Sequence, residues 1–235
     1  MVCWPISFPD GKVIRHGWIV PWATVNTVLV AATMSYILWA MDTRQFWKLI
    51  ENARTQVADA ADSEAIAASA AVLLSAFPWG EIVDAQRVLQ GLHAASYRNT
   101  LWAAASLING GCGDDGFEYF RGWLIVQGRE VFEWSVADPD LLADLPAIGP
   151  PTLDRPPIEC EETLYIAMRA YRAATGAELP AEAFTIRYPE QDAGWDFDFD
   201  DRPKMEQRLP RLTALCWPEV IHSLGSLFQS YGQLL

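Results

Sequence analysis

Residues 101–130, LWAAASLINGGCGDDGFEYFRGWLIVQGRE, decide the fold class of this chain. The first part, to Ile108, is apolar on nearly every side, which predicts a helix in the centre of the protein. The middle, Asn109 to Gly113, is rich in glycines that adopt positive φ readily, so it predicts the end of one helix and a sharp turn. The aromatic residues that follow recur at helical spacing. The segment therefore predicts two central helices joined by a glycine turn.

On both sides of this segment the chain also predicts helices, because apolar residues recur at helical spacing from Met41 onward. The residues spaced to cap helix N-termini are Asp42 with Gln45, Asp62, Asn99, Asp115 with Glu118, and Asp138. A proline-rich connector, residues 146–157, is expected to run extended over the surface. The predicted fold class is all-α, a compact multi-helix orthogonal bundle.

Near the C-terminus the run WDFDFDD, residues 195–201, alternates aromatic and acidic side chains. Its acidic residues resemble the opening of a calcium loop, but position six is Asp201 instead of glycine and position twelve is Gln207 instead of glutamate. Strict alternation predicts a short extended segment instead, with aromatic side chains on the body and carboxylates outward. The bundle is therefore expected to carry a short extended acidic-aromatic segment near its C-terminus.

The first 40 residues differ from the rest of the chain. Residues 17–40 contain no charged residue, and they reach the length of about 20 residues that crosses a bilayer. Lys12 and Arg15 precede them, as on a cytoplasmic flank, although a proline and several polar residues dilute the apolar character. A cleaved signal peptide fits less well, because the run is longer than a usual apolar region of such a peptide. Two interpretations stay open, a membrane anchor and an over-extended start before Met41.

The predicted domain organisation follows from these segments. It comprises an apolar N-terminal extension at 1–40, a helical domain at 41–217 and a C-terminal tail at 218–235. The predicted localisation is cytoplasmic, with membrane contact only if residues 17–40 are a real anchor.

Composition excludes several functions. The formal net charge is -13, which argues against nucleic-acid binding because phosphate contact needs a basic face. The four cysteines are far apart in the sequence, which predicts a reduced protein. The three histidines are not spaced as the ligands of a zinc hydrolase, and no metal site is expected. No cofactor is expected either. His93, as a lone imidazole, is expected to be a packed or surface residue.

Polar residues gather at the glycine turn. The residues predicted to hold a ligand are Asn109, Asp114, Asp115 and Arg121, together with backbone N–H groups that the glycines expose. The predicted function is a binding or regulatory interaction module, whose partner is a small polar ligand or a protein. In a purely structural interpretation the aspartates cap the helix and Arg121 pairs with Glu118 or Asp114.

An enzyme is the alternative prediction, with Cys112 as a reactive thiol. A helix N-terminus favours the thiolate, which is the form that attacks. The two aspartates that follow oppose that charge, and no histidine is fixed nearby in the sequence.

Three runs carry a family resemblance: MDTRQFWKLIENAR, WAAASLINGGCGDDGFEYFRGWLIVQGREVFE and ECEETLYIAMRAY. They resemble the bacterial family known as domain of unknown function 4240 (DUF4240), over about Met41 to Trp217. The resemblance implies a compact helical domain, which also occurs in proteins labelled as molybdate metabolism regulators. It implies no chemistry for the site residues. Residues 1–40 lie outside it, which favours the over-extended start.

Overall fold

The structure is a computed structural model of the chain, and it describes residues 12–15, 18–21, 41–150, 152, 155–184 and 198–217. The chain forms two compact units, Met1–Ala40 and Met41–Leu235. In the first unit β1 (Lys12–Arg15) and β2 (Trp18–Pro21) pair as antiparallel strands, with Val13 opposite Val20.

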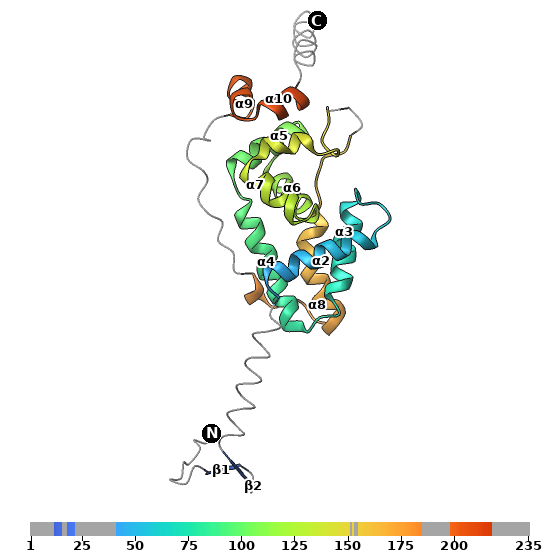
Figure 1. Cartoon of the computed structure of the whole chain (residues 1–235), viewed down its shortest axis with the longest axis vertical. Helices are drawn as coiled ribbons and strands as arrows, with labels where there is room; N and C mark the ends of the chain where they lie inside the picture. The colour runs from blue at the N-terminus through green and yellow to red at the C-terminus, as the bar shows by residue number, and fades with distance from the viewer. Residues whose placement is uncertain are drawn as a thin grey trace, which may run out of the picture. The chain divides into compact units, whose positions relative to one another are not determined.

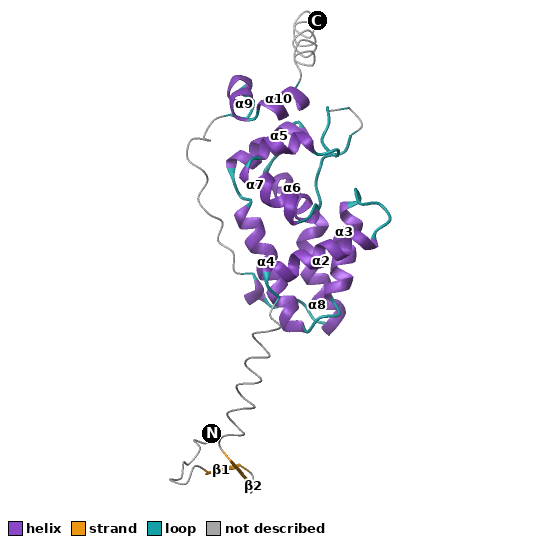
Figure 2. Ribbon diagram, viewed as in Figure 1, coloured by secondary structure: helices purple, strands orange, loops and turns teal. Residues whose placement is uncertain are grey.

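The described part of the second unit is built from α-helices and short 3-10 helices (Figure 1). They are α2 (Thr43–Gln56), α3 (Ser63–Leu74), α4 (Trp79–Ala95), α5 (Asn99–Asn109), α6 (Asp114–Val126), α7 (Arg129–Ala137), η1 (Pro139–Asp144), η2 (Glu161–Tyr165), α8 (Ile166–Thr175), η3 (Ala181–Ala183), α9 (Arg202–Arg208) and α10 (Pro210–Cys216). From Met41 on, the described residues contain helices and loops without a strand (Figure 2). The prediction of an all-α bundle is confirmed.

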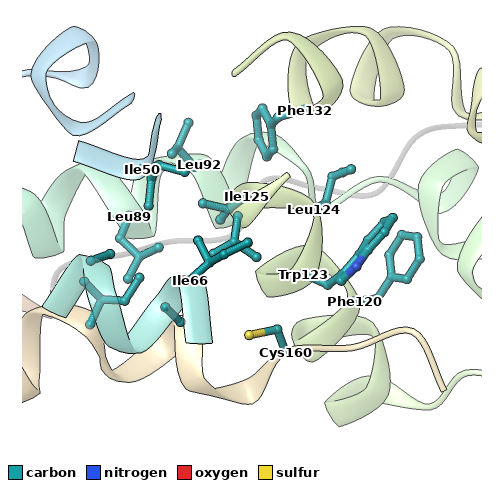
Figure 3. Close-up of a cluster of buried hydrophobic side chains, with 14 of the residues drawn as sticks. Ile50, Ile66, Leu89, Leu92, Phe120, Trp123, Leu124, Ile125, Phe132 and Cys160 are labelled. Carbon is teal, nitrogen blue, oxygen red and sulfur yellow. The ribbon is translucent and has the colours of Figure 1, made fainter. Parts of the chain in front are cut away.

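Helix α6 lies in the core of the bundle. Every residue from Phe120 to Val126 is buried, as the apolar and aromatic pattern of this segment predicts. Figure 3 shows the rings of Phe120 and Trp123 side by side, with centroids 5.5 Å apart. Full burial of a side chain as large as Phe120 contributes roughly 1.5–3 kcal/mol. The segment that decides the fold class therefore also supplies much of its core.

Most of the predicted helix ends are confirmed. Asp42 and Gln45 form the capping box of α2, with side chain to backbone distances of 2.8 and 2.9 Å. Asp62 caps α3, and Asp138 caps η1. The structure also shows Gly176 at the C-terminal end of α8 in the left-handed conformation, with φ 73°.

Two predicted caps are wrong by one or two residues. The N-cap of α5 is Arg98, and Asn99 is already the first helical residue. The N-cap of α6 is Gly113, so Asp114 and Asp115 form the first turn and make no side-chain cap bond. Glycine is one of the residues favoured at N-cap positions. The capping box predicted for Asp115 and Glu118 is therefore not formed.

The acidic-aromatic run is described only from Asp198, and residues 185–197 lie outside the described part of the chain. The described end makes a turn in which Asp201 N donates to Asp198 O at 2.9 Å. The Asp198 carboxylate also accepts from Asp200 N at 3.0 Å, because short acidic side chains bond their own backbone two residues on. Phe199 packs edge-on against Trp102, with ring centroids 6.5 Å apart.

The membrane-anchor interpretation concerns residues 17–40, of which only Trp18–Pro21 are described. Within the described residues, every helix is too short or too polar to cross a membrane. The tail at 218–235 lies outside the described residues. Both interpretations of the N-terminal extension therefore stay predictions.

Candidate functional site

The glycine turn between α5 and α6 has the predicted backbone conformation. Gly110 and Gly111 have φ values of 69° and 124°, in the left-handed region that favours glycine. A Cβ added at either position would meet no atom within 4 Å. The turn therefore needs glycine for its backbone angles and not for lack of space.

Asn109, the first predicted site residue, ties this turn to the proline-rich connector. Its Oδ1 accepts from Ile158 N at 2.9 Å, and its Nδ2 donates to Ile158 O at 3.2 Å. Arg155 reaches the same end of α5, where Nη2 donates to Ile108 O at 2.8 Å. The connector also buries Ile148, so the expectation that it runs only over the surface is wrong there. Asn109 thus uses its amide to hold the fold together.

Asp114 and Asp115 are both exposed in the first turn of α6. Their carboxylates lie at the positive end of the helix dipole, which stabilises negative charge. The predicted site residues therefore occupy three different environments, namely a bonded amide, two exposed carboxylates and, as follows, a buried guanidinium. Their role in binding a ligand stays a prediction.

Arg121 is buried, with 2% of its surface exposed. Its Nη1 donates to the backbone O of His93 at 2.7 Å, and its Nε donates to Phe117 O at 3.2 Å. The guanidinium also lies over the rings of Phe117 and Tyr97, 4.8 and 5.2 Å from their centroids. Such cation–π contacts are worth more when the cation is shielded from water. Arg121 therefore fastens α6 to the last turns of α4.

Cys112, the alternative catalytic residue, lies in an unfavourable environment for a thiolate. Burial is the main cause that raises its pKa to about 11; the charge of Glu159 contributes to the rise, and that of Arg121 opposes it. The thiol is then protonated at neutral pH, whereas nucleophilic catalysis needs the thiolate. The Sγ lies 3.7 Å from Gly113 O. The environment of Cys112 thus disfavours the enzyme alternative.

A cavity of about 350 Å³ lies between α4, α6, η2, α8 and the residue after η3. It is lined by Gln86, Leu89, Gln90, His93, Glu118, Leu164, Tyr165, Met168 and Phe184. Gln86 and His93 are each only 4% exposed. The Gln86 Oε1 and both ring nitrogens of His93 have no hydrogen-bond partner in the described structure. Neighbouring atoms shield all three of these atoms from solvent. The Gln86 amide or the His93 ring must therefore rotate toward the cavity before it can form a hydrogen bond with a ligand.

The imidazole of His93 is neutral at physiological pH. Burial is the main cause, and the nearby Arg121 charge adds to it; together they lower the His93 pKa to about 3. A neutral imidazole has one N–H donor and one acceptor nitrogen. Among the lining residues, Glu118 is the charged one, and none is a lysine or an arginine. The lining therefore combines neutral hydrogen-bonding side chains with one acidic residue.

A pattern in the sequence could have located this site. Gln86, Gln90 and His93 are spaced i, i+4 and i+7, which places them on one face of a helix. The apolar stripe of this helix accounts for Leu89 and gives no role to the three polar residues beside it. The prediction that His93 is a packed or surface residue is right about packing, since the ring is buried. What the sequence could not show is that the polar stripe lines a cavity.

The comparison with protein families identifies a related family. The sequence model of the family described as protein of unknown function (DUF4240) matches residues 41–173. This range includes Gln86, His93 and Glu118 of the cavity wall and ends before Phe184. No curated protein and no solved structure matches the chain.

Proposed function

The chain belongs to the DUF4240 family, and we propose that it is a binding module whose ligand occupies the cavity lined by α4, α6 and α8. The observation that supports this proposal is the pair of buried polar side chains on the cavity wall, Gln86 and His93. A buried polar group without a partner costs about 1–3 kcal/mol, and native proteins keep few of them. A ligand that supplies the missing hydrogen bonds would recover this free energy on binding.

The size and lining of the cavity suit a small molecule. Its volume of about 350 Å³ falls within the range of roughly 300–1,000 Å³ that is usual for small-molecule sites. Leu89, Leu164 and Met168 supply apolar wall, and a few polar groups stand among them. Small-ligand sites generally combine such an apolar lining with a few oriented polar groups.

Binding would also give the domain a means of regulation. The cavity wall comes from α4, α6 and α8, which are separate parts of the chain. A ligand that binds only the folded domain stabilises it by about 2.7 kcal/mol at one hundred times its Kd. The arrangement of these helices would then depend on the ligand concentration, which supports a regulatory role for the same site.

Nuclear magnetic resonance of the His93 ring tests this proposal on the full chain. Protein labelled with ¹⁵N in its histidine rings is titrated with small fragments of four classes: amines, carboxylates, amides and alcohols. The His93 signals are assigned by their loss in His93→Gln. We expect at least one class to shift these signals in a saturable way.

Two variants on α8 form a matched control. Met168→Trp places an indole in the cavity wall, whereas Ala173→Trp places the same side chain on an exposed position of the helix. Binding should be lost in the first variant and kept in the second. The proposal is wrong if no fragment class moves the His93 signals, or if Met168→Trp binds the fragments as well as the natural sequence does.

A further inference from the structure

We infer that the ligand of this cavity is an uncharged, elongated molecule with an amide group at each end, one paired with the side-chain amide of Gln86 and the other at the His93 ring. This inference rests on the proposed function and names the chemical class of its ligand. It comes from three features of the wall, which are its hydrogen-bonding groups, its charge and the separation of the two side chains that carry unpartnered atoms.

The polar side chains of α4 that line the cavity offer donors as well as acceptors. Gln86 and Gln90 each carry an amide, with two N–H donors on the nitrogen and a carbonyl oxygen as acceptor. His93 has a lowered pKa because it is buried, and its neutral ring has one N–H and one bare nitrogen. Gln90 already has an interaction partner, whereas the Gln86 Oε1 and both ring nitrogens of His93 have no hydrogen-bond partner in the described structure. A ligand that satisfies these groups must therefore both donate and accept hydrogen bonds.

The charge of the wall favours a neutral ligand. Glu118, the acidic residue of the lining, is half-buried and already has an interaction partner in the described structure, so its interactions do not depend on a cationic ligand. None of the described lining residues is a lysine or an arginine that could pair with an anion. A ligand of either sign would therefore leave water without a new ion pair to offset the loss of its hydration. An uncharged ligand avoids this cost.

Among neutral groups, an amide matches Gln86 best. A primary amide presents an N–H and a carbonyl oxygen along one edge, and the Gln86 side chain has the same edge. Once the Gln86 amide has rotated toward the cavity, two hydrogen bonds can join the two groups, from the ligand N–H to the Gln86 Oε1 and from the Gln86 Nε2 to the ligand carbonyl oxygen. A hydroxyl group can donate and accept, but its single oxygen cannot form both of these bonds with good geometry. The second amide of the ligand can meet His93 in either direction, because the neutral ring has a donor and an acceptor.

The elongated form of the ligand follows from the positions of Gln86 and His93 on α4. These residues are seven positions apart, which corresponds to a rise of about 10.5 Å along the helix. Because side chains on one face of a helix lean in the same direction, one small amide group cannot meet both. Leu89 lies between them in the sequence and lines the same cavity, as does Met168 of α8. The ligand must therefore have two polar ends and an apolar middle, which is the form of hexanediamide.

A series of six-carbon probes tests the end groups one at a time. Hexanediamide, hexane-1,6-diamine, hexane-1,6-diol and adipate share the carbon chain and differ in charge and hydrogen bonding at both ends. N,N,N′,N′-tetramethylhexanediamide keeps the carbonyl oxygens but has no N–H, and hexanamide keeps a single amide. Calorimetric titration of the full chain at pH 7.5, with the His93 ring signals as a check on location, gives the affinities. We expect hexanediamide to bind at least tenfold more tightly than each of the other probes.

A pair of variants then assigns the preference to Gln86. Gln86→Met keeps the length of the side chain but removes its amide, so it should lower the ratio of hexanediamide to hexane-1,6-diol affinity to about one-tenth of its natural value or less. Gln56→Met makes the same change at an exposed position at the end of α2, outside the lining. This control should change neither the ratio nor the affinities.

The outcomes distinguish this inference from the proposed function. If any of the other probes binds at His93 as tightly as hexanediamide, the ligand class is wrong while the binding module stands. An unchanged affinity ratio in Gln86→Met contradicts the amide pairing at Gln86, again without affecting the binding module. If no probe and no fragment class reaches His93, both proposals fail. The affinities of the natural sequence decide the ligand class even if Gln86→Met does not fold.

Discussion

Arg121 and His93 are joined by a hydrogen bond of 2.7 Å from the guanidinium Nη1 to the backbone carbonyl oxygen. The bond connects the aromatic helix α6 to the helix that carries the polar stripe of the cavity. Arg121 was the one buried member of the predicted polar site. Arg121 is not among the residues that line the cavity. It contacts the backbone of His93, which is a lining residue, and so holds that part of the wall in place.

Replacing Arg121 by lysine should destabilise the fold by about 2–3 kcal/mol, because a hydrogen bond to a buried charged group is lost and a charge stays buried. Lysine cannot reproduce the two bonds to His93 O and Phe117 O with one ammonium group. Urea unfolding at pH 7.5 measures the change. Arg129→Lys, in an exposed pair with Glu133, serves as control and should change stability by no more than about 0.5 kcal/mol. Equal effects of the two variants would contradict this role of Arg121.

His93→Gln should remove part of the acid sensitivity of the protein. The folded pKa of His93, about 3, lies below its ordinary value of 6.5, so the unfolded chain binds the proton more readily. The natural protein therefore loses stability as pH falls through 6.5, by about 2 kcal/mol at pH 5, while this loss is absent in the variant. Arg121 and Glu118 remain in both proteins. Unfolding free energies at pH 7.5, 6.5 and 5 test the prediction, and a difference between the two proteins that does not change with pH would refute it.

Gly122→Ala should be strongly destabilising, whereas Gly91→Ala should be neutral or stabilising. A Cβ at Gly122 would lie 2.4 Å from the backbone O of Cys160, and that backbone must shift to admit it. A Cβ at Gly91 meets nothing within 4 Å, and alanine favours a helix over glycine by about 0.5–1 kcal/mol. We expect Gly122→Ala to cost more than about 2 kcal/mol, as overpacking against rigid neighbours does. Thermal unfolding of the two variants compares them directly.

Asp115→Ala should have a small effect on stability, of about 0.3–1 kcal/mol. The side chain caps nothing in α6 and acts through the helix dipole, so its contribution should fall when salt is added. Melting temperatures at low and high salt measure it. A direct role in binding would appear differently, as a loss of affinity for the amide probes at an unchanged melting temperature.

Local features of the fold could be predicted because their causes are close in sequence. The capping box of Asp42 and Gln45 spans three residues, and the left-handed Gly110 ends its own helix. The start of α6 was missed by a short distance, since glycine and aspartate both serve as N-caps and the sequence does not choose between Gly113 and its neighbours. Helix ends are defined only to within one or two residues in any case.

The candidate site depended on contacts between distant residues, which periodicity does not show. Asn109 looked like a ligand-binding amide, yet its partner is the backbone of Ile158, 49 residues later. The polar face of α4 became a cavity wall only because Met168 and Phe184 lie opposite it. Neither pairing leaves a local pattern in the sequence, so the cavity could not be located without the fold.

The proline-rich connector joins the two parts of the chain that together line the cavity. Gln86, His93 and Glu118 precede residues 146–157, and Leu164, Met168 and Phe184 follow them. A single cut in the connector would divide the protein into two fragments, each with half of the site. A ligand that contacts both fragments would then favour their reassociation. The domain is in this sense a natural candidate for a split reporter of the molecule it binds.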